Sequence, residues 1–225
     1  MNSYRNKLIK SIADKIKCKF LNEGSGHDWW HIYRVWQNGI KIAESENADM
    51  FIVQLGCLLH DIADWKFYDG DQDIGPKKAE EILKEFAVEQ SIIERIKKII
   101  KKVSFKGAEV MHEKMNSIEG KIVQDADRLD AMGAIGIART FAYGGYKNRL
   151  IYDPNIKPVM HENQNDYIKN NSPSINHFYE KLLLLKDLMN TKTGKKMAQQ
   201  RHIFMKNYLQ QFYQEWNSNI VEISQ

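Results

Sequence analysis

A histidine followed directly by an aspartate, His60-Asp61, stands at the end of an apolar run that covers residues 51–59. Two polar side chains at the end of a buried segment cost free energy unless a partner satisfies them. A bound cation is one such partner, since imidazole nitrogen and carboxylate oxygen both coordinate divalent metals. For an isolated His-Asp pair, a capped or hydrogen-bonded helix end is the commoner explanation.

A second pair of candidate residues, His27 and His31, precedes this segment. The two histidines are four residues apart, so in a helix their side chains share one face. Asp28 or Ser25 can cap the start of that helix. Taken alone, His31 is better explained as a hydrogen-bonded residue among aromatic neighbours than as a metal ligand.

Three aspartates, Asp125, Asp127 and Asp130, lie in the otherwise apolar and small-residue stretch 118–133. Aspartate is unfavourable inside a helix, because its side chain competes for backbone hydrogen bonds, so something must compensate these three. Ion pairs with Arg128 or Arg139 are the structural explanation, and a metal ion is the functional one. Asp125 and Asp127 should not face the same ion, because two residues span roughly 200° of a helix.

The elements that carry these residues are predicted to be helices, which makes the fold class all-α. Apolar residues recur at helical spacing, and no run alternates apolar and polar residues between turns. The predicted helices cover residues 4–21, about 28–47, 49–63, 76 onward, 91–103, 118–133, about 174–190 and 194–217. Residues 142–173 are predicted to form a long loop, and loops of this length are usually lids, binding loops or mobile segments. No linker or internal repeat divides the chain, so residues 1–225 are expected to form one domain.

Composition limits the classes of protein to consider. Hydrophobic residues make up 43% and charged residues 28%, which excludes a disordered chain. No apolar run approaches the roughly 20 residues that span a bilayer, and no secretory apolar region follows Met1. Two cysteines, Cys18 and Cys57, make no disulfide framework, so a cytoplasmic location is expected. The net charge of +4 allows an anionic substrate without arguing for nucleic acid.

His31, the pair His60-Asp61 and Asp127 come from three separate predicted helices that could converge inside a bundle. Bundle cores build metal sites in this way, from side chains on facing helices. A mixed set of nitrogen and oxygen ligands suits one divalent ion of Mn, Ni, Co, Fe or Mg, and neither cysteine is placed like a ligand. With four protein ligands, such an ion keeps positions open for water and a substrate oxygen.

This order of residues resembles the HD-domain metal-dependent phosphohydrolase superfamily. The motifs that carry the resemblance are His27-Asp28-x-x-His31, His60-Asp61 with Asp64, and Ala126-Asp127-Arg128-Leu129. The segments around His177 and Arg201-His202 look like the small bacterial YedJ/YpgQ-like subgroup. The resemblance implies an HD-type helical bundle with a metal-binding core at about 27–139, completed by the loop 142–173 and two C-terminal helices within 174–217.

The resemblance also implies which residues bind the metal. The implied ligands are His31, His60, Asp61 and Asp127. Asp125 is the competitor for the fourth place, and the Ala-Asp-Arg-Leu string favours Asp127. Asp28 and Asp125 would not bind the metal themselves but would hold its ligands in place. Asp28 would do so by hydrogen bonding to the ring nitrogen of a ligand imidazole that does not bind the metal.

Catalytic and substrate-binding roles follow from the same resemblance. Asp64 falls where related hydrolases place an acidic residue that handles the attacking water, although a salt bridge with Lys66 explains it as well. Lys66 is itself a catalytic candidate, since it could neutralise phosphate charge as that charge develops. The substrate-binding candidates are His27, Lys106, Arg128, Arg139 and His177.

The subgroup is associated with cleaving nucleoside triphosphates to monophosphate and pyrophosphate, so the expected substrate is a small (deoxy)nucleotide. One alternative is another HD chemistry: hydrolysis of a guanosine tetraphosphate-type alarmone, a nucleoside monophosphate or a cyclic nucleotide. A second alternative is a nucleotide sensor without turnover. Neither a stable nucleic-acid complex nor membrane association is expected, and a homodimer is left open.

Overall fold

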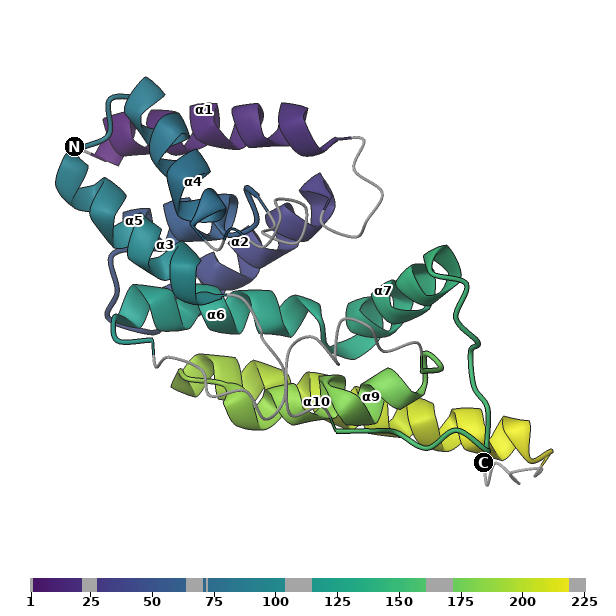
Figure 1. The fold of residues 1–225 in the computed structure, drawn as a ribbon. Coiled ribbons are helices and arrows are strands. Elements are labelled where there is room, and N and C mark those ends of the chain that lie inside the picture. Colours follow the sequence, from purple (N-terminus) through teal and green to yellow (C-terminus); the bar gives the residue numbers. More distant parts are fainter. Residues whose placement is uncertain are drawn as a thin grey trace.

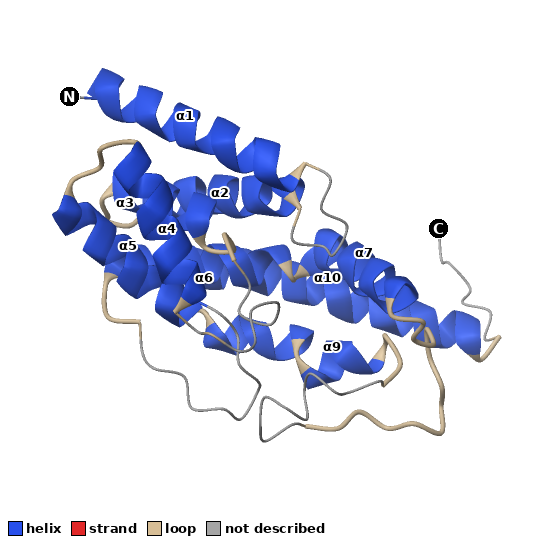
Figure 2. Ribbon diagram, turned by 45° about the horizontal axis from the view of Figure 1, so that its top comes forward, coloured by secondary structure: helices blue, strands red, loops and turns tan. Residues whose placement is uncertain are grey.

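The computed structural model describes residues 2–21, 28–63, 71, 73–103, 115–160 and 172–218. The helices are α1 (Asn2–Phe20), α2 (Trp29–Ala43), α3 (Met50–Leu59), α4 (Ile74–Glu85), α5 (Gln90–Val103), α6 (Ile118–Asp130), α7 (Gly133–Tyr146), α9 (Asn176–Glu180), the 3-10 helix η2 (Leu182–Leu188) and α10 (Lys192–Trp216). These residues include no β-strand, which confirms the predicted all-α class (Figure 2).

Polar side chains fix where several helices begin. In each case a side-chain oxygen just before the helix accepts a hydrogen bond from a backbone N–H of the first turn, which would otherwise have no partner. These capping residues are Asp28 for α2, Asp49 for α3, Ser117 for α6 and Thr191 for α10. Three of the four capped helices, α2, α3 and α6, carry or end at the candidate metal ligands.

Helix α6 lies at the centre of the molecule. It contacts the N-terminal helices α2, α3 and α5 and the C-terminal helices α7 and α10. In Figure 1, α1–α5 accordingly lie above α6, and α9 and α10 lie below it. Its buried apolar residues, Ile122, Val123, Ala126 and Leu129, belong to the same hydrophobic core as the helices on both sides. The candidate ligands on α6 are therefore held between two groups of helices.

Glycines allow the ligand-bearing helices to approach closely. A Cβ at Gly39 of α2 would lie 2.5 Å from Cys57 Sγ of α3, and one at Gly56 of α3 would lie 2.8 Å from Val123 Cγ2 of α6. Neither position has room for a larger residue without movement of a buried neighbour. The two glycines therefore set the spacing of α2, α3 and α6.

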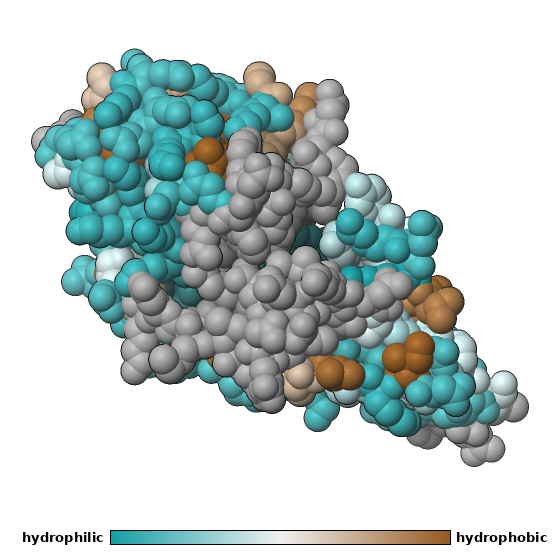
Figure 3. All heavy atoms as spheres, viewed as in Figure 1, coloured by the Kyte–Doolittle hydropathy of each residue, from teal (hydrophilic) through white to brown (hydrophobic). Residues whose placement is uncertain are grey.

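The surface in Figure 3 is mainly hydrophilic over the N-terminal helices. Within the described residues, no helix combines the length and apolar character that crossing a bilayer requires.

Several predicted boundaries are wrong. The second and third helices end at Ala43 and Leu59, before the predicted ends at about 47 and 63. The predicted loop begins too early, since α7 continues to Tyr146. The predicted helix at about 174–190 is a short helix followed by a 3-10 turn, because Lys181 adopts φ −146° and ψ −59°, which breaks the α-helical path.

Candidate metal centre

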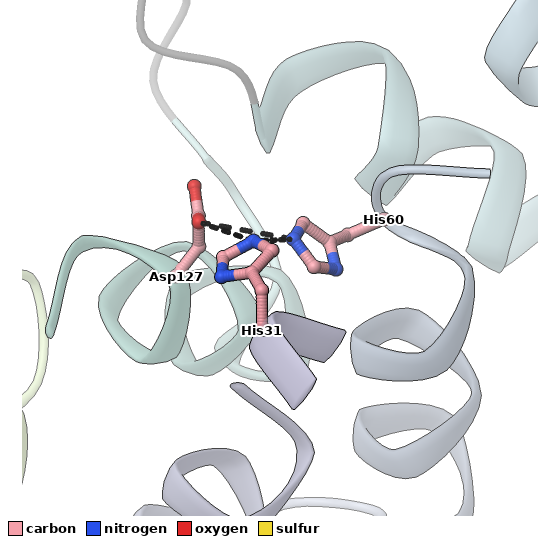
Figure 4. A group of neighbouring side chains, drawn as sticks. All are labelled: His31, His60 and Asp127. Atoms are coloured by element: carbon pink, nitrogen blue, oxygen red, sulfur yellow. Dashed lines mark hydrogen bonds and ion pairs between the residues drawn. The ribbon is translucent and has the colours of Figure 1, made fainter. Parts of the chain in front are cut away.

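His31 lies in the first turn of α2, and Asp28 fixes that turn. The Oδ1 atom of Asp28 accepts a hydrogen bond from the backbone N–H of His31 at 2.7 Å. The imidazole of His31 is buried and points toward His60 and Asp127 (Figure 4). The cap thus determines where α2 begins and places His31 at the helix end that faces the site.

His60 caps the C-terminus of α3, where the apolar run ends. Its ring is buried, and Nδ1 lies 2.8 Å from the backbone oxygen of Cys57. A carbonyl oxygen can only accept, so Nδ1 carries the proton and donates it. Nε2 is left facing the neighbouring Asp61, whose Oδ2 lies 3.4 Å away.

The candidate ligands converge around the two Nε2 atoms, as the sequence predicted. His31 Nε2 and His60 Nε2 are 3.2 Å apart, and Asp127 Oδ1 lies 3.7 Å from each of them (Figure 4). Asp61 Oδ2 lies 3.3 Å from His31 Nε2. The ligand atoms of His31, His60 and Asp127 are all within 4.8 Å of one another.

The hydrogen bonds behind the rings decide what this cluster can bind. His31 Nδ1 lies 2.7 Å from Asp130 Oδ2, so Nδ1 of His31 is also a donor. In its neutral form, each ring would therefore direct the lone pair of Nε2 into the cluster, where the carboxylates of Asp61 and Asp127 add further acceptors. Acceptors at such distances repel one another unless a positive charge lies between them. The donor set fits a divalent cation, and the carboxylate and carbonyl behind the imidazoles are the usual supports of metal-bound histidine.

The pKa of His60 reflects the concentration of negative charge in the cluster. Burial disfavours the imidazolium form of His60, but Asp61, Asp127 and the Cys57 carbonyl outweigh burial and raise the pKa of His60 to about 9. Without a cation, the acidic surroundings therefore hold a proton at His60 at neutral pH. A metal ion would have to displace that proton.

Asp130 has the opposite shift. Its burial favours the neutral acid, yet the hydrogen bonds from His31 and Arg34 lower the pKa of Asp130 well below its usual range. Asp130 is therefore an anion at neutral pH. An anionic carboxylate at Nδ1 fixes the orientation of the His31 ring.

The prediction that Asp28 orients a ligand imidazole through its other nitrogen is wrong for His31. The side chain of Asp28 accepts from a backbone N–H, and Asp130 occupies the position at Nδ1. The physical reason is the helix end, because an aspartate at the N-cap is held by the first turn that it caps.

The supporting role predicted for Asp125 is also corrected. Asp125 is fully buried and accepts hydrogen bonds from the backbone N–H groups of Asn190 at 2.9 Å and Thr191 at 2.8 Å. It also accepts one from the Thr191 hydroxyl at 2.8 Å. Asp125 thus ties α6 to the start of α10, and Asp127 is the residue of this pair that lies at the cluster.

The two predicted substrate-binding arginines, Arg128 and Arg139, both have partners within the protein. Arg128 is buried and donates to the backbone oxygen of Leu188, and burial lowers the pKa of Arg128. That contact gives Arg128 a structural role in place of the predicted one. Arg139 Nη1 lies 2.9 Å from Asp130 Oδ2. This is the ion pair that the sequence analysis offered as the structural explanation for an aspartate inside the helix. Because the Arg139 side chain keeps 27% of its surface exposed, its substrate-binding role stays a prediction.

The substrate-binding role of His177 stays a prediction. His177 lies on α9, and burial together with the charges of Lys181 and Arg149 lowers the pKa of His177 to about 3. The remaining predicted residues, His27, Asp64, Lys66 and Lys106, lie outside the described residues.

Sequence reasoning missed two roles, those of Arg34 and Asp130. Arg34 was not singled out, and Asp130 was considered only as one of three aspartates that need compensation and as a possible ion-pair partner of Arg139. Each lies three residues after a candidate ligand, Arg34 after His31 on α2 and Asp130 after Asp127 on α6. Helical residues three apart are neighbours, so this spacing was the available signal.

The chain is similar to known proteins in both sequence and structure. The sequence model described as the HD domain matches residues 29–132. The YpgQ protein of Bacillus subtilis strain 168 is 38% identical over 205 residues, which cover 91% of this chain and 92% of YpgQ.

Solved structures resemble the whole chain. An HD-superfamily hydrolase from Bacillus thuringiensis is 44% identical with a TM-score of 0.75, and the match covers 96% of this chain and 100% of that one. The crystal structure of Bacillus subtilis YpgQ in complex with ADP is 36% identical with a TM-score of 0.72, covering 92% of this chain and 97% of that one. A protein from Lactobacillus plantarum is 34% identical with a TM-score of 0.81, covering 95% and 98% of the two chains.

Proposed function

The chain belongs to the HD superfamily of hydrolases, and we propose that it is a metal-dependent phosphohydrolase that cleaves (deoxy)nucleoside triphosphates to monophosphate and pyrophosphate. The observation that carries the proposal is the convergence of two imidazole nitrogens and two carboxylates. Both imidazoles are held from behind so that Nε2 faces the cluster.

The residues that would hold the ion are His31, His60, Asp61 and Asp127. Bound there, a divalent ion of Mn, Ni, Co, Fe or Mg would supply Lewis acidity toward water and a phosphoryl oxygen. The contribution of the chain is to fix four ligands from α2, α6 and the end of α3 before substrate arrives. A rigid ligand set reduces the reorganisation that the reaction would otherwise require.

Proton transfer and charge neutralisation are assigned to side chains near the ligands. Asp64 is three residues beyond Asp61 in sequence, and we assign it the proton of the attacking water or of the leaving group. Lys66, Lys106 and Arg139 are assigned to the phosphate oxygens, where positive charge is needed as the bond breaks. The remaining predicted residues, His27 and His177, are assigned to binding of the substrate.

The choice of a nucleotide rests on the relative that was crystallised with ADP. A site that accepts a nucleoside diphosphate in that relative supports a polyphosphate nucleotide as the substrate of this chain. The same chemistry fits the cytoplasmic location predicted from sequence. It requires neither a nucleic-acid partner nor a second subunit, so the homodimer stays an open prediction.

The proposal is tested by incubating the purified protein with a panel of nucleotides and each of the five divalent ions, with products separated by chromatography. Nucleoside triphosphates should give monophosphate and pyrophosphate. Orthophosphate from monophosphates, pyrophosphate from an alarmone, or ring opening of a cyclic nucleotide would instead assign another HD chemistry. Nucleotide-dependent thermal stabilisation without product would indicate a sensor. The His60→Ala variant is the control, and turnover by this variant in metal-free buffer would contradict the mechanism.

A further inference from the structure

Asp130 lies at a point where three cationic or proton-donating side chains meet. Its carboxylate is 2% exposed, and Oδ2 is within 2.7 Å of His31 Nδ1, 3.0 Å of Arg34 Nη2 and 2.9 Å of Arg139 Nη1. Oδ1 accepts from Arg34 Nε at 2.7 Å. One carboxylate oxygen thus contacts both a candidate metal ligand and two guanidinium groups.

The helices dictate this arrangement. On α2, Arg34 follows His31 by three residues, and on α6, Asp130 follows Asp127 by three residues, so each pair shares one helix face. The two helices contact each other, which brings the pair from α2 against the pair from α6. One member of each pair enters the ligand cluster, and the other members form the ion pair beside it.

The pairing of Arg34 leaves part of its guanidinium available. Nε and Nη2 bind the two oxygens of Asp130 in a fork, which uses two of the five N–H groups that a guanidinium carries. The Arg34 side chain is 31% exposed, in contrast to the buried carboxylate. A guanidinium held in this way is oriented in advance and can bind a second anion, and phosphate oxygens match its fork geometry.

We propose that Asp130 is a positioning residue that serves the metal ligand and the substrate together. Through Oδ2 it keeps His31 in the tautomer with a proton on Nδ1, and through both oxygens it orients Arg34 as a binding group for the phosphate oxygens of the nucleotide. This inference rests on the proposed function for its substrate, whereas its effect on metal binding does not.

The first test measures Mn²⁺ binding to the full chain by titration calorimetry, without nucleotide. Asp130→Asn should weaken Mn²⁺ binding by roughly 10–100-fold, the usual effect of losing a group that supports a ligand histidine. The matched control is Asp125→Asn, which alters a second buried aspartate on the same helix whose bonds are to Asn190 and Thr191. The control should lose thermal stability and keep its Mn²⁺ affinity. Equal Mn²⁺ affinities for the two variants would overturn the proposal.

The second test concerns Arg34. In the Mn²⁺-loaded protein, Arg34→Gln should weaken binding of inorganic pyrophosphate by about tenfold or more and raise KM for the nucleotide more than it lowers kcat. Arg95→Gln is the matched control, because Arg95 joins a different buried carboxylate of α6, Glu119, at 3.1 Å. The Arg95 variant should leave pyrophosphate binding unchanged. A loss of stability in both variants with unchanged pyrophosphate affinity would reduce the Arg34–Asp130 pair to a structural contact.

A spectroscopic measurement keeps the inference testable if Asp130→Asn does not fold. The ¹⁵N chemical shifts of His31 in the metal-free wild-type protein should show a protonated Nδ1. A proton found on Nε2 instead would contradict the role of Asp130. If no nucleotide is hydrolysed while Asp130→Asn still weakens Mn²⁺ binding, the proposed function fails and the positioning role stands.

Discussion

Asp125 and Asp127 are separated by one residue on α6, yet their carboxylates have different partners. Asp127 Oδ1 lies 3.7 Å from the Nε2 atoms of His31 and His60. Asp125 instead accepts a hydrogen bond from the backbone N–H of Thr191, the residue that caps α10. The helix turns roughly 200° between them, so one aspartate faces the N-terminal helices and the other faces α10. On the same helix, Asp127 is therefore a candidate metal ligand, and Asp125 has a structural role.

Exchanging either carboxylate for an amide should separate these roles. Asp127→Asn is expected to weaken Mn²⁺ binding by more than the roughly 10–100-fold that loss of a supporting residue costs. Asp125→Asn is expected to lower the free energy of unfolding by roughly 2–3 kcal/mol, because buried donors lose a charged acceptor. Calorimetric metal titration and urea unfolding measure the two effects. If Asp125→Asn lost the metal and Asp127→Asn kept it, the assignment of the fourth ligand would be reversed.

His177 predicts a pH dependence of stability. The pKa of His177 is lowered to about 3 in the folded protein, from 6.5 for the ordinary side chain. Between these values the unfolded chain binds the proton and the folded chain does not, so this residue costs stability as the pH falls below about 6.5. The wild type should therefore lose more stability between pH 7 and pH 5 than His177→Gln, by at most about 1.4 kcal/mol per pH unit. Urea unfolding at both pH values measures the difference, and equal losses would contradict the shift.

At the scale of elements, the site depends on how closely α3 approaches α6. His60 follows directly after α3, and Asp127 lies on α6, so the spacing of these helices sets the distance between the two ligands. The contact is made at Gly56, where an added Cβ would lie 2.8 Å from Val123 Cγ2. The β-branched side chain of Val123 is fully buried and has little freedom to move away.

Gly56→Ala should therefore destabilise the protein by about 1–3 kcal/mol, even though alanine is the better helix former. In the Val123→Ala background the obstructing methyl group is gone, so the same substitution should become neutral or stabilising by up to about 1 kcal/mol. A double-mutant cycle in urea unfolding measures this change of sign. Additive effects of the two substitutions would show that the close approach is not what limits residue 56.

At the scale of the whole molecule, one small cluster joins three helices. The candidate ligands come from α2, from the end of α3 and from α6, and α6 also contacts α10 through the core. A cation that binds all of these ligands binds only the folded chain. Its binding free energy therefore adds to the stability of the bundle.

Metal should accordingly raise the melting temperature. At a free Mn²⁺ concentration of about 100 times Kd, the stabilisation is about 2.7 kcal/mol. For a chain of this size that corresponds to an increase of roughly 5–10 °C. Calorimetric melting with Mn²⁺ and then with excess EDTA tests the effect, with His60→Ala as the control. The same increase in the His60 variant would place the bound metal elsewhere.

The residue types and their spacing determined much of this protein by themselves. Helical periodicity predicted the all-α class. The order of His31, His60-Asp61 and Asp127, through its resemblance to the HD superfamily, predicted the residues that the fold brings together. Local rules also named Asp28, with Ser25, as a candidate helix cap, and they predicted the opposite orientations of Asp125 and Asp127. The helix cap and the orientations of the two aspartates depend on interactions within one helix or turn, whose geometry is the same in every protein.

Only the tertiary structure decided which residues form hydrogen bonds with the ligand imidazoles on the side that faces away from the cluster. Sequence reasoning assigned the support of an imidazole to Asp28, and the fold assigned that of His31 to Asp130, which is 99 positions away along the chain. The fold also buries Arg128 against the backbone of Leu188, which removes Arg128 from the candidate substrate site. The fold pairs Arg34 with Asp130. Such partners are set by how α2, α6 and the C-terminal helices pack, and no local pattern specifies that packing.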